Sequence, residues 1–383
     1  MDAARRSSAS SRPVTEIESL KDLDSALASG KPLTGLRLQD LDLTAYETPL
    51  LRRTDVEGLV VLGGRLPPAL DAHLRAHRAL IFPTDPAAPV DPYRATLYSP
   101  DELYAGLAQH GYEATPDFLA YQWMLDAAVH RDAFVTLLRA IHDDSMTDAL
   151  DELTEGRPVV GVMGGHDLGR DTSGYAAAAR LGHALASAGF VVATGGGPGA
   201  MEAANLGALA ADPGTLVSAL GRLATVPTFR PSVRDWAMLA FDVRRDLVPS
   251  STPRSIGIPT WFYGHEPPNV FCDGIGKYFS NAIREDGLLA RSTAGLVVLE
   301  GAAGTVQEIF QAVTPLFYAA PGARLAPLVL VGRRHWTVTV PVWPAVQALG
   351  RRRPFGQVVQ LVDTVEEATT IVVDGRSAVD APE

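Results

Sequence analysis

GGGPGAME, residues 195–202, is the stretch that decides the fold, and a second glycine-rich turn, GAAGTVQE, follows at residues 301–308. Each turn comes after a short apolar run, residues 190–194 or 295–299, and each opens a segment with the composition of a helix. A strand, a bare turn and a helix N-terminus hold a phosphate well, because backbone N–H groups converge on the anion. The pair of turns predicts a phosphate-bearing ligand such as a nucleotide or a sugar phosphate.

The segments around these turns alternate between strand and helix patterns. Strands are expected at residues 159–163, 190–194, 255–262, 295–299 and 325–331, and helices at 175–188, 200–211, 275–290 and 305–319. Alternation of this kind is typical of an α/β fold with a doubly wound, parallel, Rossmann-like sheet, whose ligands bind at the carboxyl ends of the strands. All three glycine turns, including Gly164-Gly165-His166, lie at such ends.

The first part of the chain has a different pattern and no catalytic motif. Short strands are expected at residues 36–43, 58–62 and 79–82, and apolar residues at helical spacing follow at 100–110 and 116–153. We therefore expect a disordered tail at 1–16, a smaller α+β domain of unknown role at 17–153 and the nucleotide-binding domain at 154–383.

Composition excludes several classes of function. The chain has 383 residues, 33 basic against 44 acidic, and a net charge of −11, which argues against a general nucleic-acid binder. The sequence contains no run of roughly 18 apolar residues that would predict a membrane span. No membrane partner is therefore expected. The single cysteine, Cys272, excludes an internal disulfide and is too few for a structural zinc site. We expect a cytoplasmic protein without a metal.

The first turn also has a partial match to a dinucleotide-binding pattern. Gly195-x-Gly197-x-x-Ala200 nearly fits the fingerprint, but no strand with a ribose-binding acid stands about twenty residues later. NAD is therefore disfavoured, and no cofactor is expected.

Four motifs together resemble the LOG (Lonely Guy) family, often mislabelled lysine decarboxylases, and above all its larger bacterial members related to nucleotide 5′-monophosphate nucleosidases. They are GGH at 164–166, GGGPGAMEAANLGA at 195–208, SNAIREDGLL at 280–289 and EGAAGTVQE at 300–308. The last matches the family signature Pro-Gly-Gly-x-Gly-Thr-x-x-Glu in Gly301, Gly304, Thr305 and Glu308. The resemblance covers roughly residues 158–331.

The resemblance implies hydrolysis of the N-glycosidic bond of a nucleoside 5′-monophosphate to free base and ribose 5-phosphate. Glu308 would then act as the catalytic carboxylate, which stabilises an oxocarbenium-like sugar and directs water. Thr305 and Glu308 also have the spacing of a capping box, a role compatible with catalysis. Family members usually form symmetric assemblies, so a homo-oligomer is expected.

A family arginine on the preceding helix acts with the glutamate, and Arg284 is its nearest match. Helical spacing would place Lys277, Asn281 and Arg284 on one face. A gapless alignment back from the glycine loop would instead put Glu285 at the arginine position. The alternative to a functional role for Arg284 is a solvated helix face.

Further residues are expected to bind the substrate or its phosphate, as the resemblance and the bare turns imply. They are Gly164, Gly165, Gly195, Gly196, Gly197, Gly199, Met201, Glu202, Gly301, Gly304 and Thr305. Glu202 has a second interpretation, because an acidic residue in the first turn of a helix complements the macrodipole.

The chain departs from the family signature at Glu300 and Ala302. A carboxylate beside a phosphate loop repels the ligand unless the side chain points away, and Ala302 requires a negative φ. This motivates a second hypothesis, a nucleotide-binding or sensing protein with little or no turnover. Lysine decarboxylation is disfavoured, since the only lysines are Lys21, Lys31 and Lys277, and none is expected at a strand-end turn where a pyridoxal phosphate would bind.

Overall fold

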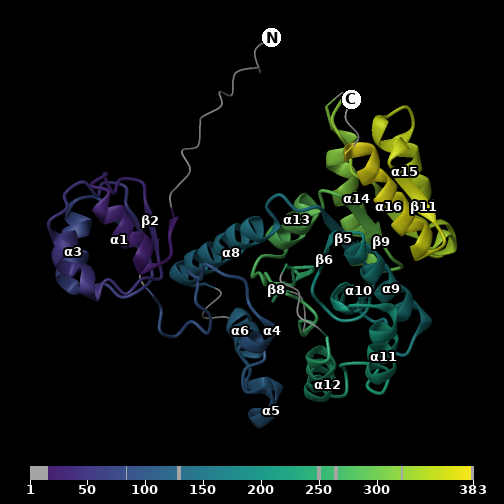
Figure 1. Ribbon diagram of the computed structural model, residues 1–383, viewed down its shortest axis with the longest axis horizontal. Helices are drawn as coiled ribbons and strands as arrows, with labels where there is room; N and C mark the ends of the chain where they lie inside the picture. Colours follow the sequence, from purple (N-terminus) through teal and green to yellow (C-terminus); the bar gives the residue numbers. More distant parts are fainter. Residues whose placement is uncertain are drawn as a thin grey trace. The chain divides into compact units, whose positions relative to one another are not determined.

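The computed structural model describes residues 16–82, 84–126, 131–247, 252–262, 266–320 and 322–380, with side chains up to 375. The chain divides into two compact units, Met1–Ala95 and Thr96–Glu383, which are described separately (Figure 1). Most of the predicted disordered tail lies outside the described residues. None of the helices described is long and apolar enough to cross a membrane.

The first unit contains a four-stranded parallel sheet whose strands follow one another in chain order. The strands are β1 (Glu16–Ile17), β2 (Arg37–Gln39), β3 (Val60–Leu62) and β4 (Leu80–Phe82). The helices between them are α1 (Leu20–Ala28), the short η1 (Thr44–Tyr46), α2 (Glu47–Leu51) and α3 (Pro68–Ala76). Leucines of these elements fill the core, with Leu23, Leu50 and Leu70 fully buried.

The second unit begins with helices that the sequence assigned to the first domain. They are α4 (Pro100–Leu103), α5 (Leu107–His110), η2 (Tyr112–Ala114), α6 (Pro116–Leu125) and α8 (Ala133–Thr154). Asp143 of α8 accepts hydrogen bonds from the backbone N–H groups of Phe279 at 2.9 Å and Ser280 at 2.8 Å. The unit boundary therefore lies at Ala95, earlier than the expected boundary at 153, because contacts between distant segments join these helices to the sheet.

The second unit is built on a seven-stranded parallel sheet in the order β11-β10-β9-β5-β6-β7-β8, which confirms the predicted doubly wound α/β fold. The strands are β5 (Val159–Met163), β6 (Val191–Thr194), β7 (Ser255–Gly257), β8 (Gly274–Ile275), β9 (Gly295–Val298), β10 (Leu328–Val331) and β11 (Val359–Val362). All residues of β5, β6 and β9 are buried, as strands covered on both faces require.

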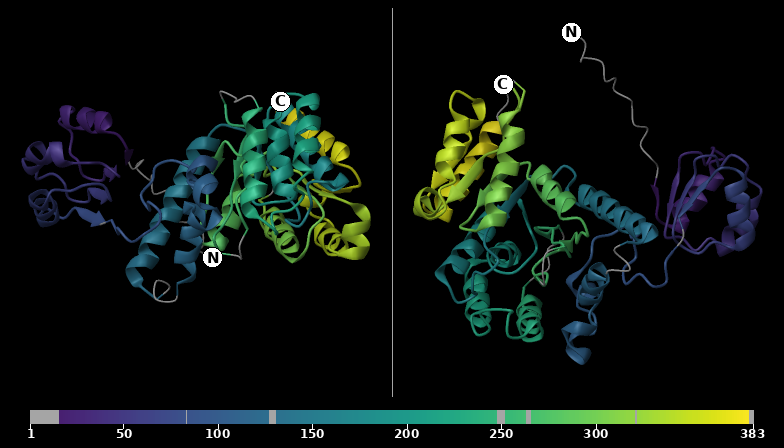
Figure 2. Two further views of the ribbon diagram at one scale, coloured as in Figure 1. Left: turned by 90° about the horizontal axis from the view of Figure 1, so that it is seen from below. Right: turned by 180° about the vertical axis from the view of Figure 1, so that it is seen from behind.

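Helices cover the sheet in two groups (Figure 2). The first group is α9 (Ser173–Ser187), α10 (Ala200–Leu209) and the C-terminal α16 (Val365–Asp380), with α11 (Pro213–Leu223) and α12 (Val233–Arg245) beside them. The second group is α13 (Asn281–Arg291), α14 (Ala303–Phe317) and α15 (Trp343–Gly350), with the short turns η3 (His335–Thr339) and η4 (Pro354–Gln357). Right-handed crossovers in opposite directions from β5 put the two groups on opposite faces.

One expected helix begins later than the sequence predicted. Residues 274–275 form the edge strand β8, and α13 begins only at Asn281. Lys277 therefore lies between the two elements, where its buried ammonium contacts Asp117 Oδ1 at 2.5 Å. The predicted helix face that joined Lys277 to Asn281 and Arg284 is wrong, because Lys277 is not helical.

Candidate functional site

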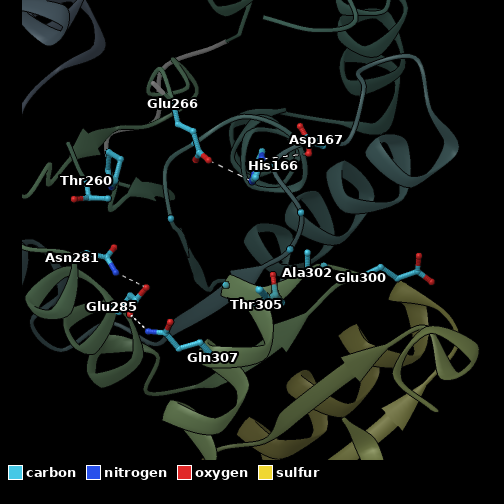
Figure 3. A pocket seen from close by; sticks show the side chains of 18 of the residues that line it. His166, Asp167, Thr260, Glu266, Asn281, Glu285, Glu300, Ala302, Thr305 and Gln307 are labelled. Carbon is cyan, nitrogen blue, oxygen red and sulfur yellow. Dashed lines mark hydrogen bonds and ion pairs between the residues drawn. The ribbon is translucent and has the colours of Figure 1, made fainter. Parts of the chain in front are cut away.

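A pocket of about 700 Å³ opens where the sheet changes direction (Figure 3). The chain runs from β5 outward through β6, β7 and β8, then returns to place β9 on the other side of β5. Open α/β sheets bind ligands at such a switch point, at the carboxyl ends of the strands. The pocket is lined by the turns that follow β5, β6 and β9, as the sequence predicted.

A buried network fixes the first glycine turn. The Thr194 hydroxyl donates to Asn205 Oδ1 at 2.6 Å and accepts from the Gly196 N–H at 2.9 Å. Asn269 holds the next carbonyls, with its backbone N–H on Gly196 O at 2.8 Å and its Nδ2 on Gly197 O at 3.1 Å. These hydrogen bonds hold the turn in place, and Thr194 and Asn205 therefore have a supporting role.

The second glycine turn leads directly into α14, and the N-terminus of α14 faces the pocket. The helix begins at Ala303, and its N-cap residue Ala302 provides no side-chain hydrogen bond to the first turn. Ala302, Ala303, Gly304 and Thr305 all line the pocket. Their setting suits an anion, because the first N–H groups of a helix lack partners within it.

The capping-box interpretation of Thr305 and Glu308 is wrong. Thr305 lies inside the first turn of α14 and not at its N-cap, so neither side chain closes the helix terminus. The φ of Ala302 is −114°, so its Cβ is tolerated at this position.

Glu300 points away from the pocket interior, as Figure 3 shows. Its Oε1 lies 2.7 Å from the position that a Cβ on Gly332 would occupy, and Gly332 has a φ of +99°. Its Oε2 lies 4.0 Å from His335 Nδ1, and 65% of the side chain is exposed. The carboxylate is therefore directed to the end of β10, and the repulsion expected at the phosphate loop is relieved.

Arg284 and Glu308 are brought together, as the resemblance implied. Arg284 Nη1 lies 3.4 Å from Glu308 Oε1, and Arg284 Nε donates to the carbonyl of Ile258 at 2.7 Å. A Cβ on Gly195 would collide with the Arg284 guanidinium, so the bare turn makes room for it. Burial raises the pKa of Glu308, while Arg284 opposes the rise and Glu285 adds to it.

Glu285 stands beside this pair and is held by three amides. Its carboxylate accepts from Asn281 Nδ2 at 2.6 Å, Gln307 Nε2 at 2.7 Å and Gln311 Nε2 at 3.3 Å. The closest guanidinium nitrogen, Arg284 Nη1, is 3.9 Å away. Arg284, and not Glu285, lies against the first glycine turn. The i, i+4 spacing of Asn281 and Glu285 was the one sequence signal for this arrangement.

The expected site residues separate into those that line the pocket and those that lie behind it. Lining residues are Gly164, Gly165, Gly195, Gly197, Arg284, Gly301, Gly304 and Thr305. Gly196, Gly199, Met201, Glu202 and Glu308 are not among them. Glu308 has 13% of its side chain exposed and reaches the pocket through Arg284.

The contacts of Glu202 and Met201 indicate a structural role for both side chains. The Glu202 carboxylate is fully buried and forms two hydrogen bonds with Arg170, at 2.5 and 3.0 Å. The Met201 thioether packs under the first turn, within 2.7 Å of where a Cβ on Gly195 would stand. The structure therefore does not bring these two side chains to the pocket.

Several polar side chains of the pocket were not anticipated. His166 lies between two carboxylates, with Nε2 3.4 Å from Asp167 Oδ2 and Nδ1 3.4 Å from Glu266 Oε1. His335 Nε2 lies 2.9 Å from the carbonyl oxygen of Gly301 and holds the second turn. His166 and Asp167 sit in the irregular segment after β5, and His335 begins the short element η3, so no periodic pattern indicates a role for them. His265, a weaker candidate from the sequence, lies outside the described residues.

A family model matches part of the second unit. The model of a family described as the SLOG cluster4 family matches residues 157–222, which run from β5 through the first glycine turn into α11. No curated protein matches the chain.

Two of the solved structures that match the chain have low sequence identity to it. The molybdenum cofactor binding protein from the phototrophic bacterium Rippkaea orientalis is 17% identical, with a TM-score of 0.36, and the match covers 59% of this chain and 99% of that one. The molybdenum cofactor carrier protein from Chlamydomonas reinhardtii is 18% identical, with a TM-score of 0.35, and the match covers 58% and 99%. The sheet order, the glycine turns and the matched residues together give the second unit a LOG-like Rossmann fold.

Proposed function

We propose that the protein hydrolyses the N-glycosidic bond of a nucleoside 5′-monophosphate. The observation that supports this best is the contact between Glu308 and Arg284, whose guanidinium lies against the first glycine turn in the pocket that the N-terminus of α14 also lines. The helix N-terminus would hold the phosphate, since its N–H groups and dipole favour an anion.

The carboxylate and the guanidinium would act on the sugar. As the bond between C1′ and the base nitrogen breaks, its electron pair leaves with the base and positive charge develops on the ribose. Glu308 would stabilise that charge and accept a proton from the water that attacks C1′. A buried carboxylate with a raised pKa is a stronger base than an exposed one, and Arg284 orients it.

A second candidate function is nucleotide binding with little turnover. It is favoured by the position of Glu308, whose side chain is 13% exposed and does not line the pocket directly. In this case the pocket would hold the nucleotide without bringing the carboxylate to C1′.

Incubation of the purified protein with AMP, GMP, CMP, UMP and a cytokinin monophosphate separates the two functions. Chromatography of free base and ribose 5-phosphate should show release that falls by about 10²–10⁴-fold in Glu308→Gln. Glu366→Gln, which removes an exposed carboxylate on α16, is the control and should retain wild-type release. Tight binding without release of base from any of the five would refute hydrolysis and support the second function.

A further inference from the structure

A row of four polar side chains on the other side of the pocket has no assigned step in the chemistry proposed above, although Glu266 is among the carboxylates that raise the pKa of Glu308. Arg230 donates to Asp167, Asp167 Oδ2 lies 3.4 Å from His166 Nε2, and His166 Nδ1 lies 3.4 Å from Glu266 Oε1. His166, Asp167 and Glu266 all line the pocket. His166 therefore links Asp167 to Glu266, and the row ends at the Glu266 carboxylate (Figure 3).

The second oxygen of Glu266 is directed to the glycine floor of the pocket. Glu266 Oε2 lies 3.4 Å from the position of a Cβ on Gly197, and no described residue donates a hydrogen bond to it. The side chain is 37% exposed, so this oxygen is accessible to a ligand. When it is ionised, a carboxylate accepts hydrogen bonds and cannot donate them.

The distance between Glu266 and the Arg284–Glu308 pair fits the two ends of a nucleoside. The Arg284 guanidinium lies over Gly195 and the Glu266 carboxylate over Gly197. Gly195 and Gly197 are two residues apart in the chain, so their Cα atoms are separated by at most about 7 Å. A ribose held at Arg284 would thus place its base along the floor, within reach of Glu266.

Four side-chain donor groups of the described pocket wall already donate within the protein, and the N–H groups at the N-terminus of α14 are assigned to the phosphate. The amides of Asn281 and Gln307 donate to Glu285, and Arg284 Nε donates to Ile258. The Thr260 hydroxyl donates to the Tyr278 carbonyl at 3.0 Å. At the base end the pocket consequently offers an acceptor, and a base that presents an acceptor there would face repulsion from Glu266.

We infer that Glu266 is a specificity-determining residue that accepts a hydrogen bond from an amino group of the base. The inference rests on the proposed function for the identity of the ligand as a nucleoside monophosphate. AMP and CMP are therefore preferred over IMP and UMP, which carry an oxygen in place of the same amino group.

Calorimetric affinities and rates of base release for the pairs AMP and IMP, and CMP and UMP, test this directly. The amino member should bind about tenfold or more tightly in the wild type, as expected for a hydrogen bond to a charged group. Glu266→Gln should reduce that ratio to within about threefold. Its affinity for ribose 5-phosphate, which lacks a base, should not fall.

Glu300→Gln is the matched control, since it removes a carboxylate of the same pocket whose side chain points away. It should change the affinities for all phosphate ligands by one common factor and preserve the ratio within each pair. Equal affinities for both members in the wild type, or an equal loss for every ligand in Glu266→Gln, would overturn the inference and leave the hydrolase proposal standing. A preserved preference without base release would support the inference and refute the proposed hydrolysis.

Discussion

The ion pair between Arg170 and Glu202 is a buried contact whose loss has a predictable cost. Both side chains are 1% exposed, and Arg170 also donates to the carbonyl of Trp236 at 3.2 Å. Glu202→Gln leaves the guanidinium charge buried without a carboxylate, so the free energy of unfolding should fall by about 3–5 kcal/mol in urea titrations.

The surface pair of Arg222 and Asp246 provides the comparison for this prediction. The Asp246 side chain is 67% exposed, so Asp246→Asn should change the free energy of unfolding by at most about 1 kcal/mol. Equal effects of the two substitutions would show that Glu202 is not held as the structure describes.

The raised pKa of Glu308 predicts a dependence of stability on pH. Its carboxyl group binds a proton more readily in the folded chain than in the unfolded chain, where the ordinary value is 4.5. The stability from this group is therefore fully present below 4.5 and is lost as pH rises through the folded pKa.

Glu308→Gln should remove this loss of stability. Its free energy of unfolding relative to the wild type should accordingly rise as the pH increases from 4.5 through the folded pKa of Glu308, as chemical denaturation can measure. A flat difference for Glu308→Gln would contradict the burial of its carboxylate.

The residues of the site were predictable from the sequence where the chain carries a motif. They were not predictable where side chains from different elements meet. Gly301, Gly304 and Thr305 were expected at the pocket and line it. The orientation of Glu300 depends on Gly332, a residue beyond the next helix, and local spacing carries no signal of that contact.

At the scale of helices and strands, phosphate binding at the N-terminus of α14 can be tested by a substitution that leaves the fold intact. Nothing lies within 4 Å of a Cβ built on Gly304, which is helical and lines the pocket. Gly304→Ala should stabilise the helix by up to about 1 kcal/mol. It should also weaken ribose 5-phosphate binding about tenfold, because the methyl group enters the space for the phosphate.

Gly221→Ala in α11 is the matched control, since a Cβ there also meets nothing within 4 Å. It should raise the melting temperature in the same way and leave the affinity for ribose 5-phosphate unchanged. A similar affinity in both variants would place the phosphate away from α14.

The strands of the large sheet were largely predictable because each is a short apolar run bounded by a turn. β5 was predicted with its observed bounds, and β6, β9 and β10 to within a few residues. The edge strand β8 is too short to show a period, and its second residue, Ile275, was assigned to the helix expected at 275–290. The helices α11 and α12 were not recognised, although each begins with a capping residue, Asp212 or Ser232.

For the whole molecule, the division at Ala95 predicts which part of the chain folds alone. Every described residue that lines the pocket belongs to the second unit. A fragment of residues 96–383 should therefore unfold cooperatively and bind nucleotide with the affinity of the full chain, as thermal denaturation and calorimetry can measure.

A fragment that starts at residue 154, the boundary suggested by sequence, should behave differently. It lacks Asp117, which pairs with the buried Lys277, and Asp143, which accepts from Phe279 and Ser280. An unpaired buried ammonium and two orphaned N–H groups should lower its melting temperature markedly or prevent folding. Equal stability of the two fragments would contradict the assignment of these helices to the second unit.

The central position of β5 has a consequence for the newly made chain. β5 is the first strand of the large sheet to be synthesised, yet one of its edges is covered only by β9, which begins at Gly295. Until β9 leaves the ribosome, the apolar residues Val159–Met163 present an open hydrogen-bonding edge. Pairing between such distant segments slows folding and prolongs exposure to aggregation. Expression at low temperature or with chaperones should therefore raise the yield of native protein more than any change in the first unit.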